Sequence, residues 1–153
     1  MNEKYMKLAL KEANGEYITF LDSDDFFAPG ILEEINQKID SLNSDIIISN
    51  LQMTYKNINA SFLGSDTSKI KGQTITPQEY KKHIYEERPS VTGKFFKREL
   101  IDSIFPPGLK WEDFAFVIPY YTKAKSIHKT SLKYNICVTQ SYILHEWAKS
   151  EGF

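Results

Sequence analysis

The chain has 153 residues, of which 41% are hydrophobic and 14% aromatic, which is enough for one domain with a real core. Its 19 basic and 20 acidic residues give a formal net charge of −1, so no basic excess indicates nucleic-acid binding. The apolar runs are too short to form a transmembrane segment, and residues 1–4 do not open a signal peptide. We therefore expect a cytoplasmic location, or a peripheral one at the inner face of a membrane. The single cysteine, Cys137, excludes an intramolecular disulfide and is expected to be a buried, inert thiol.

The first third of the chain predicts a helix, a strand and a second helix. Residues 3–13 are rich in helix formers and end at Asn14-Gly15, a typical C-cap pair. Residues 17–21 are apolar, aromatic or β-branched and predict a buried strand. Pro29 suits a first helical turn, and the apolar stripe that follows it predicts a helix running to about Leu42.

The middle of the chain predicts strands and another helix start. Residues 45–50 contain a continuous apolar run, which is typical of a strand buried on both faces. Residues 51–63 predict a half-exposed strand or a hairpin that turns at residues 57–59. A polar loop covers residues 64–72, and Thr-Pro-Gln-Glu at residues 76–79 forms a capping box that begins a helix.

The second half predicts two further helical stretches. Residues 93–101 read as a strand that runs into a short helix, and residues 105–111 form a turn-rich approach to Glu112-Asp113. Apolar residues from Phe114 to Ile127 are mostly at helical spacing. Pro119 lies within this stretch, where it would kink the helix or delay its start. Together these elements predict an α/β fold with helices flanking the sheet.

Three carboxylates within four residues, Asp22, Asp24 and Asp25, directly follow the strand predicted at residues 17–21. The carboxyl ends of strands are where α/β proteins bind ligands, and close carboxylates repel one another unless a cation or hydrogen-bond donors compensate. A hard cation, Mg²⁺ or Mn²⁺, held by these carboxylates and by phosphate oxygens would do so. The alternative is a solvated acidic turn that caps the next helix. An EF-hand calcium loop is excluded because, counted from Asp22, Phe27 stands at the position of its invariant glycine.

The sequence around this acidic turn resembles a longer signature. Residues 13–25 read A-N-G-E-Y-I-T-F-L-D-S-D-D, which is similar to the A-x-G-E-Y-I-x-F-L-D-S-D-D run of family 2 glycosyltransferases. The resemblance implies a partial GT-A (Rossmann-like) fold, a mixed sheet flanked by helices, whose DxD motif binds the nucleotide-sugar donor and a metal. It assigns both tasks to Asp22, Asp24 and Asp25, with Mg²⁺ or Mn²⁺ as cofactor and a UDP-sugar as the expected donor.

Glu112 and Asp113 form a second acidic motif. By residue type alone they are explained equally well as caps of the helix that follows, because their charge suits a helix N-terminus. Trp111 just before them offers a hydrophobic wall that would favour a role as general base. A late histidine, His145, with Trp147 nearby, is a weaker candidate for a metal-site residue than for a surface residue.

The same family resemblance extends over this second motif. The chain contains G-K-x-x-K-R-E-L and then F-P-x-G-L-x-x-E-D-x-x-F, which are similar to the downstream half of bacterial family 2 enzymes. The resemblance implies that Asp113 is the catalytic base, with Glu112 the second candidate, and it places Trp111 and Lys94 on the acceptor side. The implied reaction is inverting transfer of a sugar from a nucleotide diphosphate to a saccharide or lipid-linked acceptor, in surface polysaccharide synthesis.

The resemblance also implies what this chain lacks. Family members begin with a V-S-I-I-I-P-x-Y-N strand and βα units that hold uracil and ribose, and these have no counterpart here. We therefore expect residues 1–153 to be a single domain, the C-terminal portion of a GT-A catalytic domain. Alone, it should fold but bind a UDP-sugar weakly and turn it over at a negligible rate. Its open sheet edge would be covered by a second copy of the chain or by a missing N-terminal half. The alternative function is a non-catalytic module that binds sugar, metal or a partner chain without turnover.

Overall fold

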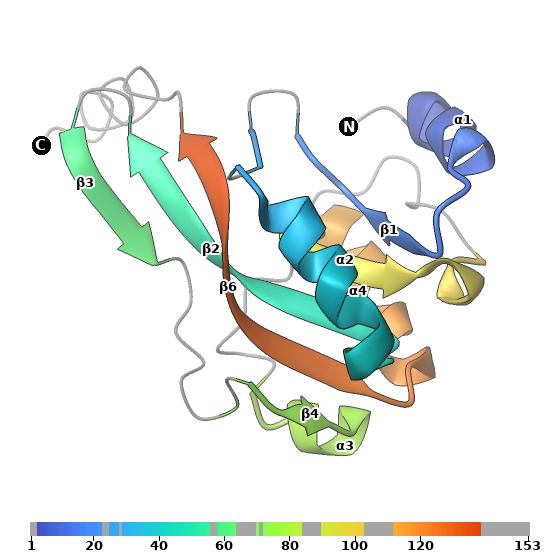
Figure 1. Ribbon diagram of the computed structural model, residues 1–153. Coiled ribbons are helices and arrows are strands. Elements are labelled where there is room, and N and C mark those ends of the chain that lie inside the picture. The colour runs from blue at the N-terminus through green and yellow to red at the C-terminus, as the bar shows by residue number, and fades with distance from the viewer. Residues whose placement is uncertain are drawn as a thin grey trace, which may run out of the picture.

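The computed structural model describes residues 3–22, 25–27, 29–55, 58–63, 70, 72–83, 90–102 and 112–138, in which helices pack on the two faces of one sheet (Figure 1). The helices are α1 (Glu3–Glu12), α2 (Ile31–Leu42), α3 (Pro77–Tyr80), the 3-10 turn η2 (Arg98–Leu100) and α4 (Glu112–Lys123). The strands are β1 (Tyr17–Thr19), β2 (Ile46–Tyr55), β3 (Ile58–Leu63), β4 (Thr74–Ile75), β5 (Lys94–Lys97) and β6 (Ile127–Val138). No helix in these ranges is long and apolar enough to cross a membrane.

The sheet is mixed, as the α/β prediction requires. Its strand order is β1-β5-β2-β6-β4, and β3 also pairs with β2. The long central strands β2 and β6 are parallel, whereas β5 runs antiparallel to both of its neighbours. The hairpin predicted at residues 51–63 is confirmed by the antiparallel pairing of β2 with β3. β1 lies at one end of the order, so the acidic turn follows a strand at the margin of the sheet.

Each face of the sheet carries its own hydrophobic cluster. On one face, α4 contributes Phe116, Val117 and Tyr120, which pack with Phe20 and Phe96. On the other face, Ile31 and Ile35 of α2 pack on the sheet, and Figure 1 shows α2 crossing in front of it. Successive strand residues point to opposite faces, so the first residues of β2 must be apolar on both. Ile46, Ile47 and Ile48 are all at most 1% exposed, which confirms the doubly buried strand predicted at residues 45–50.

Several predicted element boundaries are also confirmed or corrected. The capping box at Thr76 is present, with the Glu79 N–H donating to Thr76 Oγ1 and the Thr76 N–H donating to the Glu79 carboxylate. The second helix ends at Leu42 as predicted, but it begins at Ile31. The prediction that Pro29 occupies its first turn is wrong, because Gly30 with φ 81° lies outside the right-handed helical region. Pro119 lies inside α4 and does not delay its start at Glu112.

The predicted extension of the last helix to Ile127 is wrong. α4 ends at Lys123, and Ile127 is the first residue of the twelve-residue strand β6. Asp45 stabilises the break from the neighbouring strand: its carboxylate accepts a hydrogen bond from the Lys125 N–H at 2.6 Å, and its own N–H donates to Ser126 Oγ at 3.2 Å. Since these bonds satisfy the backbone where the helix stops, the chain turns directly into β6.

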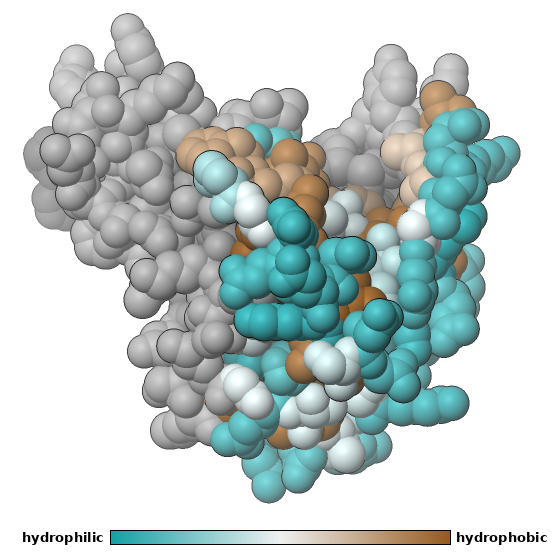
Figure 2. Space-filling model, viewed as in Figure 1, coloured by the Kyte–Doolittle hydropathy of each residue, from teal (hydrophilic) through white to brown (hydrophobic). Residues whose placement is uncertain are grey.

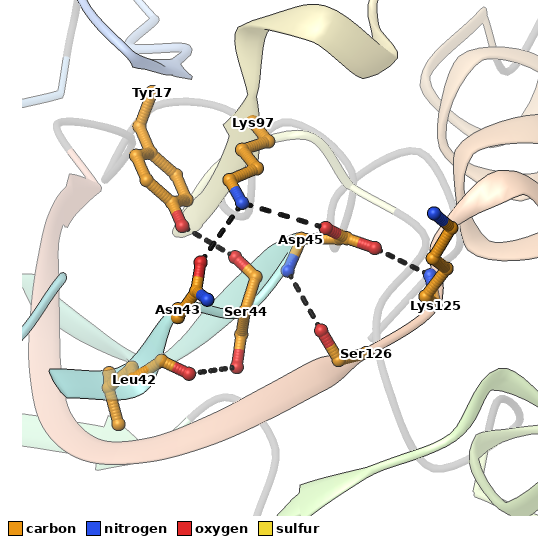
Figure 3. Close-up of polar contacts among 8 residues, drawn as sticks. All are labelled: Tyr17, Leu42, Asn43, Ser44, Asp45, Lys97, Lys125 and Ser126. Carbon is orange, nitrogen blue, oxygen red and sulfur yellow. Dashed lines mark hydrogen bonds and ion pairs between the residues drawn. The ribbon is translucent and has the colours of Figure 1, made fainter. Parts of the chain in front are cut away.

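A group of polar contacts at the end of α2 fixes the start of β1 (Figure 3). Asn43 ends the helix with φ 37°, and its side-chain oxygen accepts a hydrogen bond from Lys97 Nζ at 3.1 Å. Lys97 also lies 4.0 Å from the Asp45 carboxylate, and the Tyr17 hydroxyl donates to the Ser44 carbonyl at 2.7 Å. Burial, and after it the charge of nearby carboxylates, raises the pKa of Tyr17 to about 12, so this hydroxyl stays a donor at neutral pH. The first residue of β1 is thereby tied to β2 and β5.

Candidate active site

The acidic turn emerges from β1 beside a cluster of aromatic rings. Phe20 forms an isolated parallel bridge with Thr92, and its ring meets that of Phe116 edge-on with centroids 5.3 Å apart. Two residues later the chain reaches Asp22, which is half-buried, and the Asp25 N–H donates to the Asp22 carbonyl at 3.0 Å. Asp22 and Asp25 therefore lie on one tight turn at the carboxyl end of β1.

Asp113 lies in the first turn of α4 and is bonded to a short segment that precedes β5. Its Oδ2 atom accepts a hydrogen bond from Ser90 Oγ at 3.2 Å and another from the Val91 N–H at 3.3 Å. Ser90 Oγ in turn accepts a hydrogen bond from the Thr92 N–H at 3.2 Å. We call residues 90–92 the cradle segment, because its backbone and one hydroxyl surround this carboxylate oxygen.

The cradle segment is itself held from the sheet side. Lys94 is only 2% exposed, and its Nζ donates a hydrogen bond to the Ser90 carbonyl at 2.6 Å. The Lys94 N–H donates to the Val91 carbonyl at 3.3 Å, closing a turn in which Gly93 has φ 75°. A residue with a side chain rarely adopts that conformation, which explains the glycine at this point. Ser49 fixes the same turn, because its N–H and its hydroxyl both donate to the Gly93 carbonyl.

The cradle segment thus connects the two acidic motifs that were recognised separately in the sequence. Thr92 pairs with Phe20, two residues before Asp22, and Ser90 and Val91 bind Asp113. The roles expected from the sequence, donor binding and general base, would require the two motifs to be held in a fixed relation, because a misplaced reacting group costs rate. The fold connects the two motifs through three consecutive residues.

Comparison with known protein families and sequences relates this chain to glycosyltransferases. The family model for glycosyl transferase family 2 matches residues 5–105, which is most of the chain. The chain belongs to glycosyl transferase family 2. An uncharacterized glycosyltransferase of Haemophilus influenzae is 29% identical to it over 119 residues, covering 77% of this chain and 44% of the relative.

Solved structures agree with the family assignment. The family 2 chain is 27% identical to the S. aureus TarS 1–349 structure, with a TM-score of 0.67 over 90% of this chain. The TarS 1–349 structure in complex with UDP-GlcNAc is 25% identical, with a TM-score of 0.70 over 94% of this chain. The partial GT-A fold inferred from the sequence is therefore confirmed. The chain spans 44% of the length of the H. influenzae relative and about 40% of the TarS 1–349 chains.

The remaining predicted site residues of the family 2 chain are placed less completely. Asp24, Trp111, His145 and Trp147 lie outside the described residues, and for Glu112 only the backbone, in α4, is described. Among the residues that the structure does describe, no three His, Cys, Asp or Glu side chains gather closely enough to hold a metal ion. Metal binding by the acidic turn and the role of Glu112 therefore stay predictions.

The structure also shows site residues that the sequence analysis did not select. Ser90, Val91 and Thr92 carry no charge and match no catalytic pattern, so residue type gave no reason to choose them. A signal was nonetheless present, because Gly93 is the first residue of the stretch predicted as a strand, where a glycine indicates a turn or a close approach of the backbone to a neighbour. Lys94 was predicted on the acceptor side, and that role stays a prediction; the structure shows its ammonium donating a hydrogen bond to the Ser90 carbonyl.

Other surface features near β1 do not belong to this site. A cavity of about 290 Å³ lies between β1 and α2, and its lining includes Thr19, Asn36 and Phe95 but none of the predicted site residues. Thr19 and Phe20 alternate in direction along the strand, so this cavity lies on the α2 face, opposite the face on which Phe20 packs with α4. Figure 2 shows the outer surface of α2 as hydrophilic, with a hydrophobic area next to its N-terminal end.

Proposed function

We propose that this chain carries the donor-side acidic turn and the catalytic base of an inverting glycosyltransferase that uses a nucleotide-sugar donor. The observation that carries the proposal is the cradle segment, which pairs with the strand leading to Asp22 and also binds the Asp113 carboxylate. The acceptor oxygen must attack the anomeric carbon of the bound donor, so base and donor turn have to be adjacent. The similar TarS 1–349 structure in complex with UDP-GlcNAc supports a UDP-sugar as the donor class.

In the proposed reaction Asp113 acts as a general base. Its carboxylate takes the proton from an acceptor hydroxyl while that oxygen forms a bond to the anomeric carbon. The bond from the anomeric carbon to the diphosphate breaks on the opposite face, and its electron pair leaves with the nucleoside diphosphate. One carboxylate suffices because no covalent glycosyl-enzyme forms, in contrast to retaining glycosidases with their nucleophile and acid.

We assign divalent-cation binding to the acidic turn. Carboxylate oxygens are the ligands that Mg²⁺ and Mn²⁺ prefer, and the turn brings Asp22 and Asp25 together through the bond from the Asp25 N–H to the Asp22 carbonyl. Asp24 between them is the third proposed ligand. A cation bound there would stabilise the negative charge of the departing diphosphate as a Lewis acid. Two half-buried carboxylates on one turn fit that donor chemistry.

The acceptor is the less defined half of the proposal. Following the family resemblance, we propose a hydroxyl of a saccharide or of a lipid-linked saccharide, used in the synthesis of a surface polysaccharide. Leu21 directly precedes Asp22 and Phe26 directly follows Asp25, and their 40% and 43% exposure provides apolar surface beside the proposed donor site. Apolar surface of this kind suits the face of a sugar ring or a lipid chain.

The test is donor binding followed by NMR, which detects weak binding as well as strong. We expect millimolar UDP-GlcNAc with Mg²⁺ to shift backbone amide resonances of residues 20–22, 25–27 and 90–92, and to do so only when the cation is present. Asp22→Asn should abolish these shifts, whereas Glu12→Gln, an exposed change on α1, should leave them unchanged. Absence of cation-dependent shifts in the unaltered chain would contradict the donor site and favour the non-catalytic module.

A further inference from the structure

The hydroxyl of Ser90 has a defined hydrogen-bond direction. A hydroxyl can donate one hydrogen bond and accept others. Ser90 Oγ lies 3.2 Å from the Thr92 nitrogen, whose N–H donates to it, so the hydroxyl proton remains for the Asp113 carboxylate at 3.2 Å. The Thr92 N–H can only donate and the Asp113 carboxylate can only accept. The Ser90 hydroxyl therefore makes both hydrogen bonds only when its own proton points at Asp113.

The bonds to Asp113 fix the rotation of its carboxylate. Rotation about the last side-chain torsion of an aspartate is broad in the absence of specific contacts. Here two adjacent residues of the cradle segment both donate to Asp113 Oδ2: Ser90 through its hydroxyl and Val91 through its backbone N–H. Two donors that converge on one oxygen restrict the carboxylate plane, and they thereby set the direction of the Oδ1 atom as well.

Lys94 extends this arrangement into the core. A nearly fully buried ammonium is costly unless hydrogen-bond acceptors surround it, and a charged donor forms a shorter and stronger bond than a neutral one. Lys94 is 2% exposed and binds the Ser90 carbonyl at 2.6 Å. The backbone of Ser90 is therefore held from the sheet side, while its hydroxyl holds Asp113 on the helix side.

We propose that Ser90 is a positioning residue for Asp113, and that buried Lys94 holds Ser90 in place. The inference rests on the proposed role of Asp113 as base and adds what orients it. Thr92 belongs to the same segment and pairs with Phe20, directly after β1 and two residues before Asp22. The segment that orients the proposed base is therefore also attached to the start of the acidic turn. Lys94 would thereby act on the reaction through Ser90.

The test compares two changes at Ser90 that differ in one functional group. Ser90→Ala removes the hydroxyl, whereas Ser90→Thr retains it. UDP release is measured with UDP-GlcNAc, Mn²⁺ and a saccharide acceptor, on a protein in which an N-terminal half of the family's catalytic domain is joined to this chain. We expect Ser90→Ala to lower kcat on the order of tenfold to hundredfold and to leave the donor KM unchanged. Ser90→Thr should keep most of the wild-type kcat. Ser41→Ala, which removes an exposed hydroxyl on α2, is the matched control and should change neither constant.

A second measurement does not depend on turnover. If Ser90 orients the carboxylate, the Val91 N–H should exchange with solvent faster in Ser90→Ala than in the wild type, and at nearly the wild-type rate in Ser90→Thr. Wild-type kcat and Val91 exchange in Ser90→Ala, beside an inactive Asp113→Asn, would overturn the positioning role and leave the base assignment intact. Full activity in Asp113→Asn would instead overturn the base assignment, and this inference with it.

Discussion

Phe20 and Thr92 form a parallel bridge at the point where β1 gives way to the acidic turn. β1 itself has only three residues, and it is otherwise paired on one side, antiparallel to β5. The chain reverses direction through Gly93, so Thr92 runs parallel to β1 although the strand that follows runs antiparallel to it. The bridge gives the end of β1 a second attachment, and it does so with the segment that holds Asp113.

The first prediction concerns the base. Asp113→Asn keeps the shape of the side chain and one oxygen that can accept the bonds from Ser90 and Val91, but it removes the ability to take a proton. We expect the rate of sugar transfer to fall on the order of 10²–10⁴-fold, which is the usual contribution of a general base, with donor affinity nearly unchanged. The measurement is kcat and donor KM for UDP release, made on a protein in which an N-terminal half of the family's catalytic domain is joined to this chain. A variant that keeps most of its rate would move the role to Glu112 or remove it altogether.

The second prediction concerns the cation. We expect Mn²⁺ titrated into the protein to broaden the amide resonances of residues 22–25 before any others, because Mn²⁺ is paramagnetic and prefers carboxylate oxygens. Asp24→Ala should reduce this broadening strongly, since one of three proposed ligands is lost. Glu33→Gln, an exposed carboxylate in the first turn of α2, is the control for non-specific attraction to negative charge. Broadening that persists in Asp24→Ala or is uniform over the protein would contradict the site.

The third prediction compares the effect on stability of removing a buried and an exposed phenylalanine from the same helix, α4. Phe116 is 2% exposed and its ring lies edge-on to Phe20 and Phe96, with centroids 5.3 and 5.7 Å apart. Phe116→Ala should lower the free energy of unfolding by about 3–5 kcal/mol, through lost burial and the cavity left behind. Phe114 on the same helix is 50% exposed, so Phe114→Ala should change it by no more than about 0.5 kcal/mol. Urea unfolding of the two variants measures both changes in the free energy of unfolding. Equal decreases in Phe116→Ala and Phe114→Ala would show that the rings around Phe116 do not form the core described.

The elements that the sequence predicted correctly are those with a dense local signal. The apolar stripe of α2, the Thr76 capping box and the apolar start of β2 each follow from residues only a few positions apart. β6 was missed although every second residue from His128 to Val138 is aromatic, apolar or β-branched, because lysines and Asn135 between them made the segment look polar. That alternation is a strand pattern, and counting it would have ended the helix before Ile127.

The residue types of the candidate site and their expected roles could be predicted from the sequence, but most contacts between them could not. The spacing and charge of the acidic residues indicated a metal and donor turn and a base, and their resemblance to a family signature selected those roles. No local pattern could show that Ser90 and Val91 bind Asp113 across more than twenty residues. Lys94 illustrates the same limit: a lysine side chain is usually exposed, and only the packing around β5 shows that this one is buried.

The fourth prediction concerns pH and the buried His128 at the start of β6. Its Nδ1 lies 2.9 Å from Thr74 Oγ1 on β4, and the side chain is 8% exposed. Burial, and to a lesser extent the positive charge of Lys38, holds the pKa of His128 below its usual range. In the unfolded chain the imidazole titrates near its ordinary pKa of about 6.5, so below that pH the unfolded state binds a proton that the folded state binds less readily.

The free energy of unfolding should therefore fall as the pH decreases from about 7, through the pKa of the unfolded state near 6.5, to the lower pKa of the folded state. His128 contributes a slope of at most about 1.4 kcal/mol per pH unit in this range. Above about pH 7 the contribution of His128 is constant, because the imidazole is neutral in both states. His128→Gln keeps a polar side chain opposite Thr74 and cannot titrate, so it should flatten the profile between pH 7 and the onset of carboxylate protonation. Urea unfolding at several pH values measures both profiles. An identical slope in the wild type and in His128→Gln would show that burial of this imidazole does not contribute to the acid sensitivity of the fold.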